Sequence, residues 1–554
     1  MTHTPSTANT ERPWSAAYRR YGIADQVPPT PYETVTALME AAMQRHAERP
    51  AFRAFGQTLS YADVDRQSAA FAAWLQTRLG VKKGDRVAVM MPNFLAFPIA
   101  FLGIVRAGAV QVSVNPLYTP RELAHQLKDS GCEVLIIFSA ATPTFAEIAD
   151  STPVRHVVTV LPGDGSSARL PGPPVDARLK DSVSFEQALT EGASLRHQPV
   201  TLSGEDLLFL QYTGGTTGFS KGAALSHRNL VSNVAQFKAF MSSATREGQE
   251  VLVTAIPLYH IFALMVNFIT YFSIGSDNWL VANPREIDGF IDTLAQARPT
   301  VFMGVNTLYA GLVAHPRLRE VDFSRLRLSG GGGAAVLPST SQKWQQITGN
   351  FIREGYGLSE TGPVLSFNPE AIESFSHSTG LPVPGTDILL LDADDQPVSG
   401  AGQAGEICAT GPQIMSGYWQ QAEANRAAFT ADGYFRTGDI GYFDERGFLC
   451  IADRKKDMVL VSGFNVYPNE VEAVASALAG VLECACTGVP DDKTGEAVRL
   501  FVVQGPGANL TETQVIEHCR QGLAAYKVPR QVVFQDSLPK STVGKIKEIP
   551  LVRC

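Results

Sequence analysis

The chain has 554 residues, too many for one hydrophobic core, because cores stop growing at about 250–300 residues. Hydrophobic residues make up 45% and charged residues 18% of the chain, values that argue against wholesale disorder. The net charge of −8, from 46 basic and 54 acidic residues, argues against nucleic acid as a partner. We therefore expect a globular protein of at least two domains.

The N-terminal third shows neither a secretory signal nor a membrane-spanning segment. Residues 1–29 lack the basic stretch followed by an apolar stretch of a signal peptide, and we expect a loosely ordered arm there. The apolar stretch 87–112 contains two prolines and an arginine, which favours a buried helix beside a strand over a transmembrane helix. The seven cysteines include no paired zinc-site spacing, so we interpret them as reduced thiols of a cytoplasmic protein.

Strand and helix patterns alternate over most of the chain before residue 353, and this rhythm predicts βαβ units with helices on the faces of a parallel sheet. The stretch 161–204 is rich in Pro, Gly and Ser and predicts a surface excursion. The elements expected in the first half are a helical region at 32–79 broken by a strand–turn–strand at 51–60, strands at 86–91, 109–114 and 133–138, and a helix at 120–130; βα alternation resumes at 206–353.

The last 170 residues differ from this pattern. Short strands expected at 388–391, 406–409 and 448–451, with frequent glycine turns across 386–451, predict a small β subdomain. Five charged residues at 453–457 then precede a new β/α pattern, and a domain boundary would fall there. We therefore predict a large α/β N-terminal domain at 1–452 with two βα subdomains and the small β subdomain, a hinge linker at 453–457, and a small α+β C-terminal domain at 458–554.

A segment rich in glycine and threonine follows the buried strand expected at 207–211. Four glycines allow the backbone to curl so that its N–H groups face an anion, and hydroxyl groups add further donors. Lys221 supplies a positive charge that can pair with phosphate. The segment predicts a nucleotide-phosphate loop formed by Tyr212, Thr213, Gly214, Gly215, Thr216, Thr217, Gly218 and Lys221.

This loop does not have the Walker A pattern, in which Gly precedes the lysine and Ser or Thr follows it. Here Ser220 precedes Lys221 and Gly222 follows it. The alternative, a flexible surface loop of glycines and threonines without a ligand, is left open by composition alone. The run YTGGTTGFSKGA resembles the signature loop of the adenylate-forming superfamily, which includes acyl-CoA synthetases, luciferases and peptide-synthetase adenylation domains.

The resemblance covers residues 59–547 and is closest to bacterial long-chain fatty-acid–CoA ligases. It implies that a mobile C-terminal domain completes the site. It also implies His260 beside the acyl pocket, a glycine loop containing Gly333 and the motif of Tyr356, Gly357 and Ser359 at the nucleotide, and Glu360 with Thr213 at Mg²⁺. In the later motifs it implies Asp439 and Arg454 at the ribose, Lys456 as the hinge, Gly463 beside the pantetheine arm of CoA, and Lys545 as the catalytic lysine.

The activity implied by the resemblance joins a long-chain or medium-chain fatty acid to CoA, with ATP converted to AMP and pyrophosphate through an acyl-adenylate. A fatty acyl-AMP ligase that loads a carrier protein and a non-catalytic lipid or nucleotide sensor are the alternatives. The apolar segment 261–274 is either part of the acyl pocket or a buried helix without a ligand. Acyl chain length, a role in β-oxidation, uptake or signal turnover, a homodimer, and peripheral contact with the inner membrane are left open.

Overall fold

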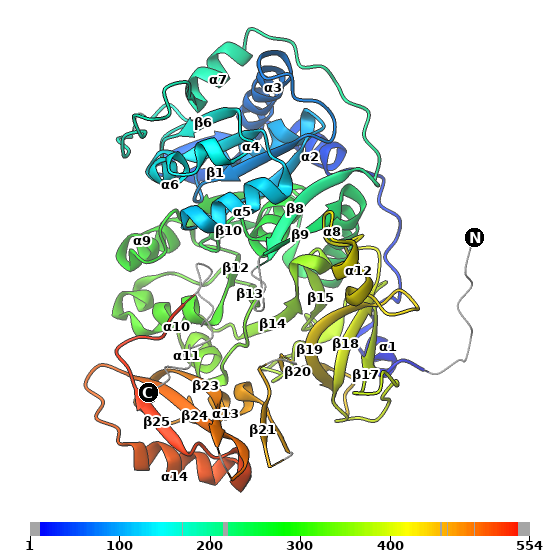
Figure 1. Ribbon diagram of the computed structural model, residues 1–554, viewed down its shortest axis with the longest axis vertical. Helices are drawn as coiled ribbons and strands as arrows, with labels where there is room; N and C mark the ends of the chain where they lie inside the picture. The colour runs from blue at the N-terminus through cyan, green and yellow to red at the C-terminus, as the bar shows by residue number, and fades with distance from the viewer. Residues whose placement is uncertain are drawn as a thin grey trace.

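The computed structural model describes residues 11–168, 170–213, 220–454, 457–462, 464–491 and 493–540 (Figure 1). In Figure 1 the blue-to-green α/β part occupies most of the long axis, the yellow β sheet lies at its side, and the orange-to-red C-terminal elements lie at one end. The predicted fold class, a large α/β domain with a small β subdomain followed by a small α+β domain, is confirmed. The exact domain boundaries stay a prediction.

The sheet that carries the phosphate-loop strand has the order β7-β6-β5-β3-β4-β8-β9. Its neighbouring strands are parallel except β8 and β9, which are antiparallel. The parallel strands are nearly continuous apolar runs because helices cover them. Their bounds are β3 Arg86–Met90, β4 Val110–Ser113, β5 Val134–Phe138, β6 His156–Val160, β7 Val183–Ser184, β8 Leu207–Thr213 and β9 Lys221–Ser226.

The other large sheet has the order β16-β15-β14-β13-β12-β10-β11-β1-β2, parallel from β14 to β1 and antiparallel at both ends. The parallel part is the second βα region expected from the sequence. Its bounds are β1 Pro50–Ala54, β2 Gln57–Ser60, β10 Val251–Thr254, β11 Asp277–Leu280, β12 Val301–Gly304, β13 Leu328–Gly331, β14 Ile352–Gly357, β15 Val364–Phe367 and β16 Leu381–Pro382.

Local capping signals place several helices that flank these sheets. Capping boxes begin α3 at Ser60, α5 at Thr119 and α8 at Ser226. The α-helices of the large domain are α1 Ser15–Tyr21, α2 Val35–Arg45, α3 Tyr61–Arg78, α4 Ala96–Arg106, α5 Pro120–Ser130, α6 Thr142–Ala146, α7 Phe185–Gly192, α8 His227–Phe240, α9 Ile287–Ala297, α10 Asn306–Ala314, α11 Pro338–Thr348 and α12 Ala422–Ala428.

The apolar stretch 87–112 forms β3, α4 and β4, as predicted. Every residue of α4 is buried, including Arg106, whose guanidinium contacts the carboxylates of Asp65 and Glu40. Among the helices that the structure describes, none has the length and apolar character that crossing a membrane requires. The predicted surface excursion at 161–204 is only partly right, because β7 joins the sheet and α7 packs against α3.

The small β sheet has the order β17-β18-β19-β20 and is antiparallel, with bounds β17 Asp387–Leu391, β18 Gly405–Thr410, β19 Phe435–Phe443 and β20 Leu449–Arg454. Helix α1 packs on it, which corrects the expectation of a loosely ordered N-terminal arm for the described residues after 10. The ring of Trp14 lies tilted against that of Phe443 on β19, with ring centroids 5.3 Å apart, and Tyr18 donates its hydroxyl to the carbonyl of Pro382 on β16 of the nine-stranded sheet at 2.6 Å. Burial of two aromatic rings fixes this helix.

The C-terminal sheet has the order β22-β21-β24-β23, with β25 parallel to β24. Helices α13 and α14 pack against each other, and their buried side chains join one core with the strands. This arrangement confirms the expected small α+β domain. The bounds are β21 Val459–Val461, β22 Phe464–Val466, β23 Val481–Asp491, β24 Gly495–Gln504, β25 Gln531–Phe534, α13 Pro468–Ala475 and α14 Glu512–Gly522.

Candidate active site

The predicted phosphate loop connects two antiparallel strands. In the β8–β9 ladder Thr213 pairs with Lys221 and Tyr212 pairs with Gly222, so both ends of the loop are held together by the ladder. A Walker A loop instead leads into a helix, and the observed hairpin agrees with the sequence argument against that motif. The loop residues between the two strands, Gly214, Gly215, Thr216, Thr217 and Gly218, lie outside the described residues, so their phosphate contacts stay predictions.

Helix α5 holds both ends of the loop. Tyr212 donates its hydroxyl to Oδ2 of Asp129 at 2.6 Å, and Nε2 of His125 lies 2.8 Å from the carbonyl oxygen of Ser220. Burial, reinforced by Asp129, raises the pKa of Tyr212. The hydroxyl of Tyr212 is therefore used in a hydrogen bond to α5. The predicted contact of Tyr212 with the nucleotide stays a prediction.

Glu360 lies next to the start of the loop. It belongs to the 3₁₀ turn η6 Ser359–Thr361, and Ser359 begins this turn. The carboxylate of Glu360 accepts a hydrogen bond from the hydroxyl of Tyr418 at 2.9 Å, and Oγ1 of Thr213 lies 3.5 Å from the same oxygen. Burial raises the pKa of Glu360, so a cation near this carboxylate would favour its charged form.

The donors at this point fit Mg²⁺. A carboxylate oxygen and a threonine hydroxyl are hard oxygen ligands, and Mg²⁺ at nucleotide sites takes one or two carboxylates together with substrate phosphates. Within the described parts of the chain, no cluster of three or more His, Cys, Asp or Glu residues is placed to hold a metal without such a substrate. Glu360 and Thr213 are therefore suited to a cation that arrives with a nucleotide.

Three of the predicted nucleotide residues meet where strand β14 approaches β19 and β20 of the small β sheet. Tyr356 on β14 donates its hydroxyl to Oδ2 of Asp439 on β19 at 2.6 Å. Asp439 pairs with Arg454 in the β19–β20 ladder, and Nε of Arg454 lies 3.7 Å from Oδ1 of Asp439. Burial raises the pKa of Tyr356. An aromatic ring from β14 thus meets a carboxylate and a guanidinium from β19 and β20, which lie about 80–100 residues further along the chain, and the carboxylate oxygens can accept the hydroxyls of a nucleoside.

The glycines of this region are required by close packing. A Cβ at Gly357 would lie 1.7 Å from the carbonyl oxygen of Pro363, and a Cβ at Gly330 would lie 2.2 Å from the sulfur of Met303. The glycine run 330–333, which contains the predicted loop residue Gly333, is a loop only in part, because Gly330 and Gly331 are the last residues of β13. Gly333 has a φ of +77°, a left-handed conformation that favours glycine.

The segment that carries His260 is held by a residue of the other βα region. Asn93 donates from Nδ2 to the carbonyls of Thr254 and Ile256 at 3.1 and 3.0 Å, and its Oδ1 accepts from the N–H of Leu258 at 2.7 Å. Its Nδ2 also lies 3.3 Å from the carbonyl of Val281. Asn93 is 3% exposed. One buried amide therefore satisfies several backbone groups of the segment that leads to His260.

A π-helix, Phe262–Thr270, follows His260, and Nδ1 of His260 accepts from the N–H of Phe262 at 3.3 Å. π-Helical turns are often found at functional sites. The ring of Phe262 lies 3.7 Å from where a Cβ of Gly332 would be. The π-helix therefore begins beside the glycine loop that contains Gly333. Its other side chains are buried, among them Phe268, which packs edge-to-face on Phe52. Both interpretations of 261–274, acyl pocket or buried helix, stay open.

Sequence reasoning missed two residues of this site, Asn93 and Tyr418. The ammonium of Lys221 lies 5.2 Å from the ring centroid of Tyr418. The groups that the side chains of Asn93 and Tyr418 contact are 58 to 197 residues away in sequence. No local sequence pattern predicts contacts of this kind. The predicted residues Lys456, Gly463 and Lys545 lie outside the described residues, so their roles as hinge, pantetheine contact and catalytic lysine stay predictions.

Beside the predicted hinge, Asp453 links the two domains. Its Oδ2 accepts from the N–H of Asn469 at 3.0 Å, at the start of α13, and its Oδ1 accepts from the N–H of Arg454 at 2.7 Å. Burial raises the pKa of Asp453 to about 6. The hydrogen bond to Asn469 ties the last strand of the small β sheet to the first helix of the C-terminal domain.

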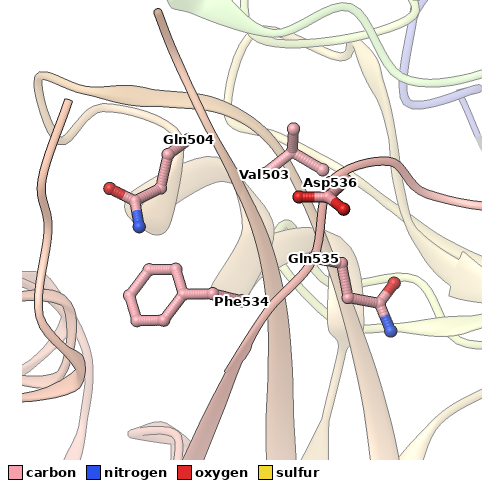
Figure 2. Close-up of a pocket in the computed structure, with 5 residues that line it drawn as sticks. All are labelled: Val503, Gln504, Phe534, Gln535 and Asp536. Carbon is pink, nitrogen blue, oxygen red and sulfur yellow. The ribbon is translucent and has the colours of Figure 1, made fainter. Parts of the chain in front are cut away.

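Figure 2 shows a pocket of about 360 Å³ in the C-terminal domain, where β24 ends beside β25. The phenyl ring of Phe534 and the amide of Gln504 lie on one side of the view, and Asp536 follows the end of β25. The residues that line the pocket, Val503, Gln504, Phe534, Gln535 and Asp536, include none of the predicted site residues. The pocket is therefore separate in composition from the candidate active site.

Known proteins match almost the whole chain. A family model described as AMP-binding enzyme matches residues 39–419, and one described as AMP-binding enzyme C-terminal domain matches residues 470–545. The chain belongs to the AMP-binding enzyme family. The first match contains the loop between β8 and β9, Glu360 and Tyr418, and it ends at residue 419.

The proteins similar to this AMP-binding enzyme include one named as a CoA ligase and one named as a CoA synthase. The long-chain-fatty-acid–CoA ligase of Salmonella typhimurium is 47% identical over 536 residues, which cover 95% of each protein. The feruloyl-CoA synthase of Amycolatopsis sp is 35% identical over 508 residues, which cover 91% of this chain and 95% of that protein. The solved structure of ATP-bound MatB from Rhodopseudomonas palustris, 31% identical, has a TM-score of 0.78 and covers 93% of this chain and 97% of that one.

Replacing the buried carboxyl of Glu354 should change how stability depends on pH. Burial raises the pKa of Glu354 from 4.5 to about 8, and its Oε1 accepts from the N–H of Val336 at 3.2 Å. Between about pH 4.5 and 8 the unfolded chain releases this proton and the folded protein keeps it. The group therefore lowers the free energy of unfolding by up to about 1.4 kcal/mol per pH unit as pH rises.

We expect Glu354→Gln to remove this decline, so that the variant gains stability over the wild type as pH rises from about 4.5 to 8. Urea unfolding at a series of pH values measures it. Exposed Glu373→Gln is the matched control and should follow the wild-type profile. Parallel pH profiles of wild type and Glu354→Gln would contradict the assignment.

Removing the amide of Asn93 should destabilise the protein, because the buried carbonyl of Ile256 and the buried N–H of Leu258 lose this partner, whereas the carbonyl of Thr254 keeps the N–H of Val281. We expect Asn93→Ala to lower the free energy of unfolding by about 3 kcal/mol, since each buried unsatisfied group costs about 1–3 kcal/mol. Exposed Asn283→Ala, which loses the bond to Glu286 and the bond from the N–H of Arg285 at the surface, should change it by less than about 0.5 kcal/mol. Equal midpoints of urea unfolding for the two variants would contradict the role of Asn93.

Proposed function

We propose that the protein is an ATP-dependent long-chain fatty-acid–CoA ligase. It joins a fatty acid to CoA and converts ATP to AMP and pyrophosphate through an acyl-adenylate. The observation that carries the proposal is the convergence of Thr213, Glu360, Tyr356, Asp439 and Arg454 around a hairpin-closed loop. The relative named long-chain-fatty-acid–CoA ligase, 47% identical over 95% of each chain, supports the choice of acid.

In the first half-reaction a carboxylate oxygen of the fatty acid attacks the α-phosphorus of ATP. The bond between that phosphorus and the bridging oxygen breaks, and pyrophosphate leaves with the electron pair. The protein contributes positioning and charge rather than covalent chemistry. Asp439 accepts the ribose hydroxyls, the ring of Tyr356 lies against the adenine, and Lys221 and Arg454 offset negative charge on the phosphates.

Glu360 and Thr213 would hold Mg²⁺, which supplies positive charge to the phosphates when it is bound. The raised pKa of the buried Glu360 carboxyl supports this assignment, because a cation there would offset the cost of burying the charge. We extend the proposal to Lys545, whose ammonium would approach the α-phosphate from the C-terminal domain, as the resemblance implies.

In the second half-reaction the thiol sulfur of CoA attacks the acyl carbon of the adenylate. A carbon–sulfur bond forms, the bond from the acyl carbon to the phosphate oxygen breaks, and AMP leaves. The C-terminal domain would turn about Lys456, withdraw Lys545 and bring Gly463 to the pantetheine arm. Domain rotation of this kind lets one site serve two steps.

The proposal also assigns the chain to the cytoplasm, where its substrates ATP and CoA are available. Contact with the inner membrane would be peripheral, and a homodimer stays a prediction. Two other activities use the same first step. A carrier-protein-loading acyl-AMP ligase would not respond to CoA, and a ligase for aryl acids, as the name of the feruloyl-CoA synthase indicates for that relative, would prefer a ring to an alkyl chain.

The proposal predicts CoA-dependent release of AMP with saturated fatty acids, rising with chain length toward the long-chain acids. Each buried methylene contributes about 0.8 kcal/mol, so kcat/KM should rise by up to about fourfold per methylene until the pocket is filled. The measurement compares acids from about four to eighteen carbons, with ferulic acid as the aryl control. Pyrophosphate release without any effect of CoA would favour the carrier-loading activity, and a preference for ferulic acid would overturn the fatty-acid assignment.

Lys545→Ala should separate the two half-reactions. We expect it to slow adenylate formation by about 10²–10³-fold, because one charge contact in the transition state is lost. Thioester formation from supplied acyl-adenylate should stay within about twofold of the wild type, because that step would proceed with Lys545 withdrawn.

Lys540→Ala is the matched control for this substitution, since Lys540 is paired with Glu483 in the C-terminal domain. Both half-reactions of Lys540→Ala should resemble the wild type. An equal loss in both half-reactions of Lys545→Ala would show that the lysine does not act in the first step alone.

A further inference from the structure

Tyr418 touches two groups of opposite charge at the end of the phosphate loop. Its hydroxyl donates to Oε1 of Glu360 at 2.9 Å, and the ammonium of Lys221 lies 5.2 Å from the centroid of its ring. One side chain thus contacts the carboxylate suited to Mg²⁺ and the lysine suited to phosphate. Neither the loop pattern nor the motif of Glu360 points to this tyrosine.

We propose that Tyr418 is a positioning residue of the adenylation half-reaction, which holds Glu360 and Lys221 ready for the cation and the phosphates of ATP. The inference rests on the proposed function, since it assigns a part in its first step. Tyr418 acts through the two charged side chains and is not assigned a contact with the reacting atoms. The alternative is a packing role, in which only the volume of the ring matters.

The backbone around Tyr418 is bound to both elements that carry its partners. The N–H of Ala224 donates to the carbonyl of Gly417 at 2.9 Å and the N–H of Trp419 donates to the carbonyl of Gly222 at 2.8 Å, so 417–419 lies along β9. The N–H of Met415 donates to the carbonyl of Glu360 at 2.8 Å. One short segment therefore fixes the spacing between β9, where Lys221 begins the strand, and the turn that holds Glu360.

The side chain of Asn425 fixes this segment from α12. Its Oδ1 accepts from the N–H of Tyr418 at 2.6 Å, and its Nδ2 donates to the carbonyl of Tyr418 at 2.9 Å. Both backbone groups of Tyr418 are thereby satisfied by one amide. The backbone of Tyr418 is therefore fixed by hydrogen bonds before any ligand binds.

The two contacts act differently on the charged groups. A carboxylate can accept about four hydrogen bonds, so one bond from Tyr418 restricts rotation of Glu360 and leaves lone pairs for a cation. The face of an aromatic ring attracts an ammonium, so the ring restrains Lys221, which is otherwise exposed. Groups that are ordered in advance lose less conformational freedom on binding, which favours the charged ligand.

Tyr418→Phe tests the hydroxyl, because phenylalanine keeps the ring over Lys221 and the packing. We expect the Mg²⁺ concentration that gives half-maximal ATP binding, measured by calorimetry, to rise about tenfold, because a hydrogen bond to a charged group is lost. The KM for ATP in pyrophosphate release should rise with it. Tyr418→Leu removes the ring as well and should lower the rate of pyrophosphate release by a further factor of about three.

Tyr434→Phe is the matched control, because Tyr434 donates its hydroxyl to Oδ2 of Asp387 at 2.7 Å in the small β sheet. This variant should bind ATP with the Mg²⁺ dependence of the wild type. Thioester formation from supplied acyl-adenylate should stay within about twofold of the wild type for Tyr418→Phe.

Wild-type Mg²⁺ dependence of ATP binding in Tyr418→Phe would overturn the inference. An equal loss in both half-reactions would also overturn it, because it would indicate a structural role. A wild-type protein that releases no pyrophosphate with any fatty acid would refute the proposed function instead. In that case the calorimetric comparison of Tyr418→Phe with Tyr434→Phe still decides whether Tyr418 prepares the site for Mg²⁺ and ATP.

Discussion

Antiparallel pairing of β9 with β8 holds Thr213 opposite Lys221, so the phosphate loop begins and ends at strands about 5 Å apart. A parallel neighbour would need a long crossover and could not close the loop in this way. Because β8 is itself paired with β4 in the parallel sheet, the buried core of that sheet fixes where the loop begins. Helix α5 on one side and the 417–419 segment on the other then bind the two strands.

The rest of the site is built outward from this hairpin. Thr213 meets Glu360, whose turn follows β14, and β14 also carries Tyr356 to Asp439 on the small β sheet. Strands from three sheets therefore share one chain of polar contacts. The buried carboxylates of Glu360 and Asp439 have a cost of desolvation that their partners offset, so the position of one strand constrains the others.

Much of the fold could be predicted from the sequence, because helices and strands that bury one face carry apolar residues at regular spacings. The alternation of β3, α4 and β4 could be predicted since Pro and Arg interrupt an otherwise apolar run, whereas the domain boundary placed at the charged run 453–457 stays a prediction. Strand β19 was missed because Arg436, Thr437, Gly438 and Asp439 hide its alternation. Helix α1 was missed because its seven residues are fixed by Trp14 and Tyr18 against a sheet that is distant in sequence.

The site could be predicted in part, because some of its residues lie in recognisable local motifs rather than in a periodic pattern of burial. Glycines and charged groups at Glu360, Asp439 and Arg454 lie in segments that resemble the adenylate-forming superfamily. Asn93 and Tyr418 are not among the motif residues singled out from the sequence, and their roles follow only from tertiary contacts with backbone and side chains far along the chain.

Exchange of labelled pyrophosphate into ATP tests the central claim most directly, because it reports reversible adenylate formation without the second half-reaction. The account predicts exchange that requires both Mg²⁺ and a long-chain fatty acid and that proceeds without CoA. Exchange that is absent with every fatty acid, or that needs CoA to begin, would contradict the assignment of this site to acyl-adenylate formation.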